Sequence, residues 1–143
     1  MIDEKTFVND SKATNVDSVW YAIDAMTQKT IWIVGGVDKG NDYSELYDLV
    51  KQKIKAIVCL GKDNSKIKKA FADFVPKIVE TQTANDAVRK ASFLAEKNET
   101  ILLSPACASF DLFKNYIDRG NRFKKAVLDL EKEWIAAKNT KNI

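Results

Sequence analysis

The sequence predicts an α/β fold in which a mostly parallel sheet carries helices on both faces. Short apolar runs alternate with longer segments whose apolar residues recur at helical spacing, and this unit appears five times along the chain. The runs are apolar at nearly every position, which is typical of parallel strands buried on both faces. With 143 residues, of which 45% are hydrophobic and 30% charged, the chain has the length and composition of one globular domain.

Each element follows from its local pattern. The strands are expected, in chain order, at residues 6–9 (TFVN), 30–34 (TIWIV), 56–60 (AIVCL), 77–80 (KIVE) and 100–103 (TILL). Apolar stripes predict helices over residues 16–23, 46–50, 67–74, 87–94 and 113–130. Thr14 with Asp17 is typical of a capping pair for the first helix, and Thr83 is expected to open the fourth. Gly35, Gly61 and Pro105 end three of the strands. The alternation predicts a doubly wound, Rossmann-like sheet.

Composition excludes several chemistries. The chain has no His, so Ser-His and Cys-His nucleophilic pairs and His-metal sites are absent. Cys59 and Cys107 lie 48 positions apart, which fits neither a metal site nor a disulfide framework. No GxxxxGK[ST] motif is present, so the main grip on a nucleotide phosphate is not expected in this chain. Two lone cysteines without a signal peptide predict a cytoplasmic protein.

The net charge of +3 has a local origin. Residues 114–143 hold eight basic and four acidic side chains, so the other residues sum to −1. Only three of the 23 basic residues are Arg, and acids are interleaved with them, which is typical of a solvated helix face. No apolar run approaches the roughly 20 residues of a membrane span. We therefore expect a soluble monomer that binds neither nucleic acid nor membranes.

The loops that follow the strands are the candidate site, because ligands of open parallel sheets bind beyond the carboxyl ends of the strands. These loops are residues 10–15, 35–40, 61–63 and 104–109. Their lysines and hydroxyls suit an anion such as a carboxylate, and they are Lys12, Lys39, Thr14, Ser104 and Ser109. Three of them have an ordinary alternative: Lys39 as a solvated loop lysine, and Thr14 and Ser109 as helix N-caps.

Three of these loops, taken together, resemble one family. Residues 9–15 (NDSKATN), 35–40 (GGVDKG) and 104–120 (SPACASFDLFKNYIDRG) are similar to the C-terminal domain of the Mur ligases that add D-glutamate to UDP-N-acetylmuramoyl-L-alanine, a peptidoglycan precursor. The resemblance implies that residues 1–138 form that domain, and residues 139–143 are expected to be a frayed tail. It also implies a three-domain cytoplasmic enzyme, whose first domain would hold the UDP substrate and whose central domain would hold ATP and Mg2+.

The resemblance further implies a reaction and a set of roles. ATP phosphorylates the carboxylate of the UDP substrate to an acyl phosphate, and the amine of D-glutamate attacks it. By motif position, the D-glutamate contacts are Thr14, Lys39, Ser109 and Tyr116, the last standing where the family has Phe. Asp10 would face the ATP ribose, and Lys12 the phosphates or the developing charge. Because closure needs the other domains, the isolated domain is expected to be inactive.

Two rival classes share the α/β alternation. A signalling receiver domain needs an acidic cluster after its first and third strands and a Lys after its fifth. Asp10 has no acidic neighbour here, and Ser104 with Pro105 ends the last strand, which argues against a receiver. A freestanding ligand-binding or interaction module remains the alternative. An open reading frame that continues upstream into a P-loop domain would favour the ligase.

Overall fold

The computed structural model describes residues 2–38 and 40–141, and its centre is a parallel sheet. The strands are β1 (Thr6–Asn9), β2 (Thr30–Val34), β3 (Ile54–Leu60), β4 (Ile78–Thr81) and β5 (Thr100–Leu103). They are arranged in the order β1-β5-β2-β3-β4, and every neighbouring pair is parallel. The predicted α/β class is therefore confirmed.

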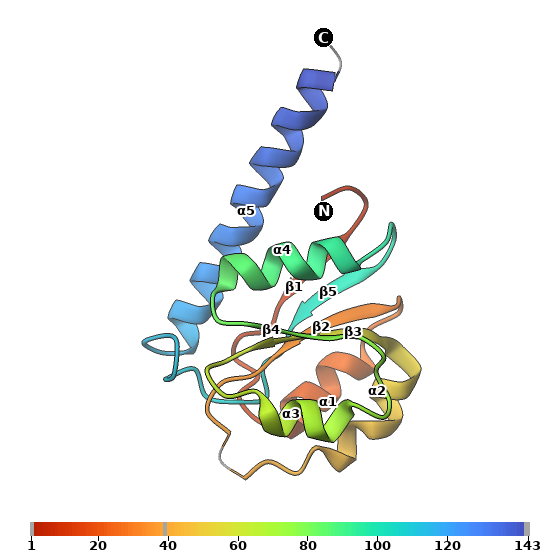
Figure 1. The fold of residues 1–143 in the computed structure, drawn as a ribbon, viewed down its shortest axis with the longest axis vertical. Coiled ribbons are helices and arrows are strands. Elements are labelled where there is room, and N and C mark those ends of the chain that lie inside the picture. The colour runs from red at the N-terminus through yellow and green to blue at the C-terminus, as the bar shows by residue number, and fades with distance from the viewer. Residues whose placement is uncertain (1, 39, 142–143) are drawn as a thin grey trace.

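Helices cover both faces of this sheet. They are α1 (Val16–Asp24), the 3-10 helix η1 (Tyr43–Leu46), α2 (Tyr47–Lys53), α3 (Ser65–Phe71), α4 (Ala84–Leu94) and α5 (Tyr116–Lys141). In Figure 1, α1, α2 and α3 lie on one face, and α4 and α5 on the other. The long α5 extends well beyond the edge of the sheet. Its course is continuous to Lys141, without a break at the expected start of the tail.

The alternation of side chains along β2 explains why its whole run is apolar. Trp32 and Val34 belong to the core under α1, α2 and α3, whereas Ile31 and Ile33 belong to the core under α4 and α5. All four are fully buried, as expected for a strand covered on both faces. The indole Nε1–H of Trp32 donates to the carbonyl of Ser104 at 2.7 Å, so the core also holds the segment that follows β5.

The N-cap of α1 differs from the one that the sequence predicts. The N-cap of α1 is Asn15, whose side chain accepts from the amide of Ser18 at 2.8 Å, so the predicted Thr14–Asp17 pair is wrong. Asn is as good an N-cap as Thr, and the helix begins at Val16, as the apolar stripe predicts. By contrast, α4 is capped by Thr83, as expected.

The terminal helix begins at Tyr116, three residues after its predicted start at 113. The amides of Leu112 and Phe113 donate to the carbonyl of Ser109, which folds this stretch into a turn. The side chain of Asn115 then accepts from the amide of Asp118 at 2.8 Å, as an N-cap does. Phe113 is nevertheless buried, which is why its apolar character extended the helical pattern.

Candidate functional site

Strand order brings the motif-bearing loops to one place. Because β5 lies between β1 and β2, the segments that leave the carboxyl ends of these strands are neighbours. We call them the first loop (residues 10–15), the second loop (residues 35–42) and the last loop (residues 104–115). An edge of this kind, where connections to opposite faces of the sheet diverge, is the usual ligand position in open α/β folds.

The last loop is bonded through its backbone to both of the others. The amide of Ala106 donates to the carbonyl of Ala13 in the first loop at 2.9 Å. The amide of Gly35 donates to the carbonyl of Pro105 at 3.0 Å, and that of Val37 to the carbonyl of Ala108 at 2.8 Å. The three segments therefore form one hydrogen-bonded surface.

The Gly-Gly pair that opens the second loop has a specific steric role. Gly36 has a φ of +138°, which L residues rarely adopt, and a Cβ at this position would lie 2.2 Å from the carbonyl oxygen of Ala108. Only glycine lets the second loop approach the last loop this closely.

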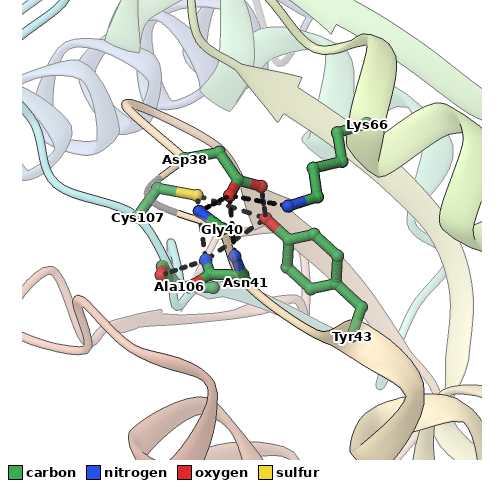
Figure 2. A network of polar contacts seen from close by, with 7 residues as sticks. All are labelled: Asp38, Gly40, Asn41, Tyr43, Lys66, Ala106 and Cys107. Atoms are coloured by element: carbon green, nitrogen blue, oxygen red, sulfur yellow. Dashed lines mark hydrogen bonds and ion pairs between the residues drawn. The ribbon is translucent and has the colours of Figure 1, made fainter.

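Asp38 organises the second loop (Figure 2). Its carboxylate accepts four hydrogen bonds, from the amide of Gly40, the amide of Asn41, the hydroxyl of Tyr43 and the Nζ of Lys66, at 2.9, 2.9, 2.7 and 3.1 Å. Burial by itself would raise the pKa of Asp38, but these donors outweigh burial and hold the pKa below its usual value. Asp38 is thus an ionised anchor of the loop at neutral pH.

The same network reaches the last loop (Figure 2). The side-chain amide of Asn41 donates to the carbonyl of Ala106 at 3.0 Å, and the hydroxyl of Tyr43 lies 3.4 Å from the Sγ of Cys107. Burial raises the pKa of Cys107, so this thiol is a packed core group, as expected. Lys39 lies outside the described residues, and its role stays a prediction.

Asp10 is bonded within the site edge. Its carboxylate accepts from the hydroxyl of Ser104 at 3.0 Å. Burial raises the pKa of Asp10, and this single hydrogen bond offsets only part of the rise. Because the hydroxyl proton of Ser104 is used here, Ser104 is not a free donor for a ligand, in contrast to the expectation.

The remaining candidates differ in exposure. Lys12 and Thr14 are exposed, and within residues 2–38 and 40–141 their side chains make no hydrogen bond or ion pair. Ser109 is 2% exposed and precedes no helix, and Tyr116 is 39% exposed at the start of α5. Neither Thr14 nor Ser109 is a helix N-cap, so their ordinary alternative does not apply.

A hollow of about 410 Å³ lies beside the second loop. Its lining includes Gly36, Lys62, Lys66 and Asp111, which come from the strand-end edge and the start of α3. Among the described residues, no group of three Asp, Glu or Cys side chains is arranged to hold a metal ion. In the same part of the chain, no helix is long and apolar enough to span a membrane.

Sequence reasoning missed Arg119, which is 1% exposed. Its guanidinium donates to the carbonyl of Ser11 at 2.9 Å, to the hydroxyl of Ser11 at 3.1 Å and to the carbonyl of Cys107 at 3.0 Å. Burial lowers its pKa to about 10, which still leaves it charged at neutral pH. A signal was present: Arg119 stands four residues before the buried Phe123, on the core-facing stripe of α5.

Comparison with known proteins places these loops in context. The family described as "Mur ligase, glutamate ligase domain" matches residues 1–107. A UDP-N-acetylmuramoylalanine--D-glutamate ligase of Cytophaga hutchinsonii is 60% identical over 87% of this chain, and one of Bacteroides thetaiotaomicron is 57% identical over 87%. The chain spans 28% of the length of each of these relatives.

Solved structures agree on the fold. A domain assigned to a UDP-N-acetylmuramate:L-alanyl-gamma-D-glutamyl-medo-diaminopimelate ligase of Haemophilus ducreyi superposes with a TM-score of 0.60. The superposition covers 94% of both chains at 13% sequence identity.

Proposed function

Because the chain belongs to the Mur ligase family as a glutamate ligase domain, we propose that it is the C-terminal domain of an ATP-dependent ligase that adds D-glutamate to UDP-N-acetylmuramoyl-L-alanine. The relatives that carry this activity in their names are 46–60% identical to the chain over 87–90% of its length. Their names favour this function over a freestanding binding module. The enzyme would be cytoplasmic and monomeric.

One observation carries the proposal: the last loop is hydrogen-bonded to both of the other motif-bearing loops at a single edge of the sheet. The last loop joins the first loop through Ala106 and the second loop through Val37. Residues far apart in the sequence can therefore act on one small ligand.

D-glutamate would be held by residues from all three loops. The ammonium of Lys39 would pair with a glutamate carboxylate, and Thr14 and Ser109 would donate hydrogen bonds to it. The exposed, uncommitted side chain of Thr14 supports this role. Tyr116, which is partly exposed, would pack its ring against the aliphatic part of the substrate.

The nucleotide would contact the first loop. Asp10 would accept from the ATP ribose, and the exposed Lys12 would face the phosphates or the charge that develops on them. The described residues include no metal cluster and the sequence has no P-loop, so ATP and Mg2+ would be held mainly by the rest of the enzyme.

The contribution of this domain would be positioning. In the reaction, the terminal phosphoryl group of ATP is transferred to the substrate carboxylate and ADP leaves. The amine of D-glutamate attacks the acyl carbon, and the tetrahedral intermediate loses phosphate to leave an amide. Fixing the amine beside the acyl carbon can remove several kcal/mol of the barrier, about 7 kcal/mol or more in well-oriented cases.

A ligase assay on the full-length enzyme tests the proposal. Phosphate release is measured with UDP-N-acetylmuramoyl-L-alanine, ATP and one amino acid at a time. Among the amino acids, we expect only D-glutamate to give phosphate release. Release with a different amino acid would retain the reaction but contradict the substrate assignment. Release with none would return the domain to the class of freestanding binding modules.

A further inference from the structure

Arg119 is an unusual group for the interior of this domain. A buried charge is costly unless it is paired or fully hydrogen-bonded. Among the described residues Arg119 has no ion pair with a carboxylate; its guanidinium is held by two backbone carbonyls and one hydroxyl. These acceptors come from the first loop and the last loop. The hydrogen bonds of the guanidinium therefore join two loops that are about a hundred residues apart in the chain.

Ser11 extends this connection to the start of α5. Its hydroxyl accepts from Arg119 at 3.1 Å and donates to the carbonyl of Tyr116 at 2.7 Å. The first turn of α5 is in turn tied to β1, because the side-chain amide of Asn9 donates to the carbonyl of Gly120 at 3.1 Å. A Cβ at Gly120 would lie 3.2 Å from the Cβ of Ser11, so the helix and the first loop are in close contact.

From this arrangement we infer that Arg119 is a positioning residue, which sets the first loop, the last loop and Tyr116 in register. The inference rests on the proposed function. Ser11 stands between Asp10 and Lys12, and Cys107 stands two residues before Ser109. The guanidinium thus holds the backbone beside the groups proposed for the nucleotide and beside those proposed for D-glutamate, while touching neither ligand itself.

The planar fork of Arg is needed for this geometry. Its Nε and Nη2 donate to the hydroxyl and the carbonyl of Ser11, while Nη1 donates to the carbonyl of Cys107. A Lys at this position has one point-like ammonium and cannot reproduce two parallel bonds to one residue and a third to another. Loss of the fork should loosen both loops together.

Steady-state kinetics of Arg119→Met in the full-length ligase test the inference. We expect the KM for D-glutamate and the KM for ATP each to rise by about tenfold or more, whereas the KM for UDP-N-acetylmuramoyl-L-alanine changes by less than about twofold. A merely structural role would lower the amount of active enzyme, and so reduce kcat while both KM values stay unchanged. That second pattern would overturn the inference.

Three further variants keep the test decisive. Arg122→Met removes an exposed Arg one turn away, which pairs with Asp118 at 3.0 Å, and should leave all three KM values unchanged. If Arg119→Met does not fold, as judged by circular dichroism, Arg119→Lys replaces it with the same expected KM pattern.

In Arg119→Ala, guanidinium ion at a concentration that leaves the unaltered enzyme unaffected should lower both raised KM values. KM values for D-glutamate and ATP in Arg119→Ala equal to those of the unaltered enzyme would contradict the inference.

The two hypotheses fail in different ways. Turnover of D-glutamate by the unaltered enzyme tests the proposed function alone. The ratio of KM values between variant and unaltered enzyme tests the role of Arg119, and it can be measured with whichever amino acid the enzyme accepts.

Discussion

Two aspartates beside the site, Asp10 and Asp38, have pKa values displaced in opposite directions. Both are partly buried, which raises the pKa of each. Asp38 then receives four hydrogen bonds, one of them from the ammonium of Lys66, and its pKa falls below the usual value. Asp10 receives one, from Ser104, and its pKa stays raised. The number of donors around each carboxylate decides the sign.

Asp10→Asn is expected to stabilise the 143-residue chain at neutral pH while impairing nucleotide use in the full-length enzyme. The pKa of Asp10 is raised above 3.8 in the fold, so the ionised form costs stability at every pH above the folded value. Asn removes that cost and still accepts from Ser104. Urea midpoints measured from pH 7 downward should show the variant ahead at pH 7, with the gap closing as the pH falls toward 3.8. A variant less stable than the native chain at pH 7 would contradict this assignment.

Lys39→Ala in the full-length ligase is expected to raise the KM for D-glutamate by about tenfold to a hundredfold, because a charge-assisted hydrogen bond is worth about 1.5–3 kcal/mol. The KM for UDP-N-acetylmuramoyl-L-alanine should not change. Lys69→Ala, which removes an exposed lysine of α3 outside the strand-end loops, is the matched control. An unchanged KM for D-glutamate in the Lys39 variant would remove Lys39 from the proposed site.

At the scale of elements, the last loop lies between the other two loops because β5, which it follows, lies between their strands. β5 pairs with β1 on one side and β2 on the other. The last loop, which continues β5, repeats this pattern: the amide of Ala106 donates to the first loop, and the amide of Val37 in the second loop donates to the carbonyl of Ala108. The sheet order is thereby carried past the ends of the strands into the loops.

Gly36→Ala tests how tightly the second loop must approach the last loop. Its Cβ would overlap the carbonyl oxygen of Ala108, and its φ is unfavourable for Ala, so a loss of about 2–4 kcal/mol in the free energy of unfolding is expected. Gly40→Ala is the control, because Gly40 also has a positive φ, +89°, but among the described residues, chain neighbours aside, no atom lies within 4 Å of an added Cβ. Backbone strain alone should cost that variant about 1–2 kcal/mol. Equal losses, measured by chemical denaturation, would refute the close-approach argument.

At the scale of the whole molecule, the chain spans 28% of the length of its Cytophaga hutchinsonii relative. Of the groups proposed for D-glutamate, the described ones, Thr14, Ser109 and Tyr116, lie on or beside the loops at one edge of the sheet. The acyl phosphate would form on another part of the enzyme. Catalysis would therefore require that the parts close on one another.

The 143-residue chain alone is expected to release no phosphate from ATP, with or without D-glutamate and UDP-N-acetylmuramoyl-L-alanine. The full-length ligase under the same conditions is the positive control for the assay. Measurable turnover by the 143-residue chain would overturn the proposed division of labour between the domains.

Much of the fold was predictable because its signals are local. A strand buried on both faces must be apolar throughout, so TIWIV at 30–34 was recognisable, and Thr83 caps α4 because a side-chain oxygen at that place satisfies a free amide. Local signals also mislead: Asn15 rather than Thr14 caps α1, and the buried Phe113 lies before α5 rather than on it. At α1, two nearby polar residues could each serve as the N-cap. At α5, a buried residue before the helix continued its apolar pattern. The path of the chain decided both.

The sequence by itself determined the class of fold, the family resemblance and the loops that bear the candidate residues, since these depend on composition, periodicity and contiguous motifs. Only the tertiary structure decided the order of the strands, which puts β5 between β1 and β2. It also decided that Arg119 turns inward to Ser11 and Cys107 rather than outward as Arg122 does. Both depend on contacts between segments distant in the chain, and a local pattern carries no information about which distant carbonyl a buried charge will meet.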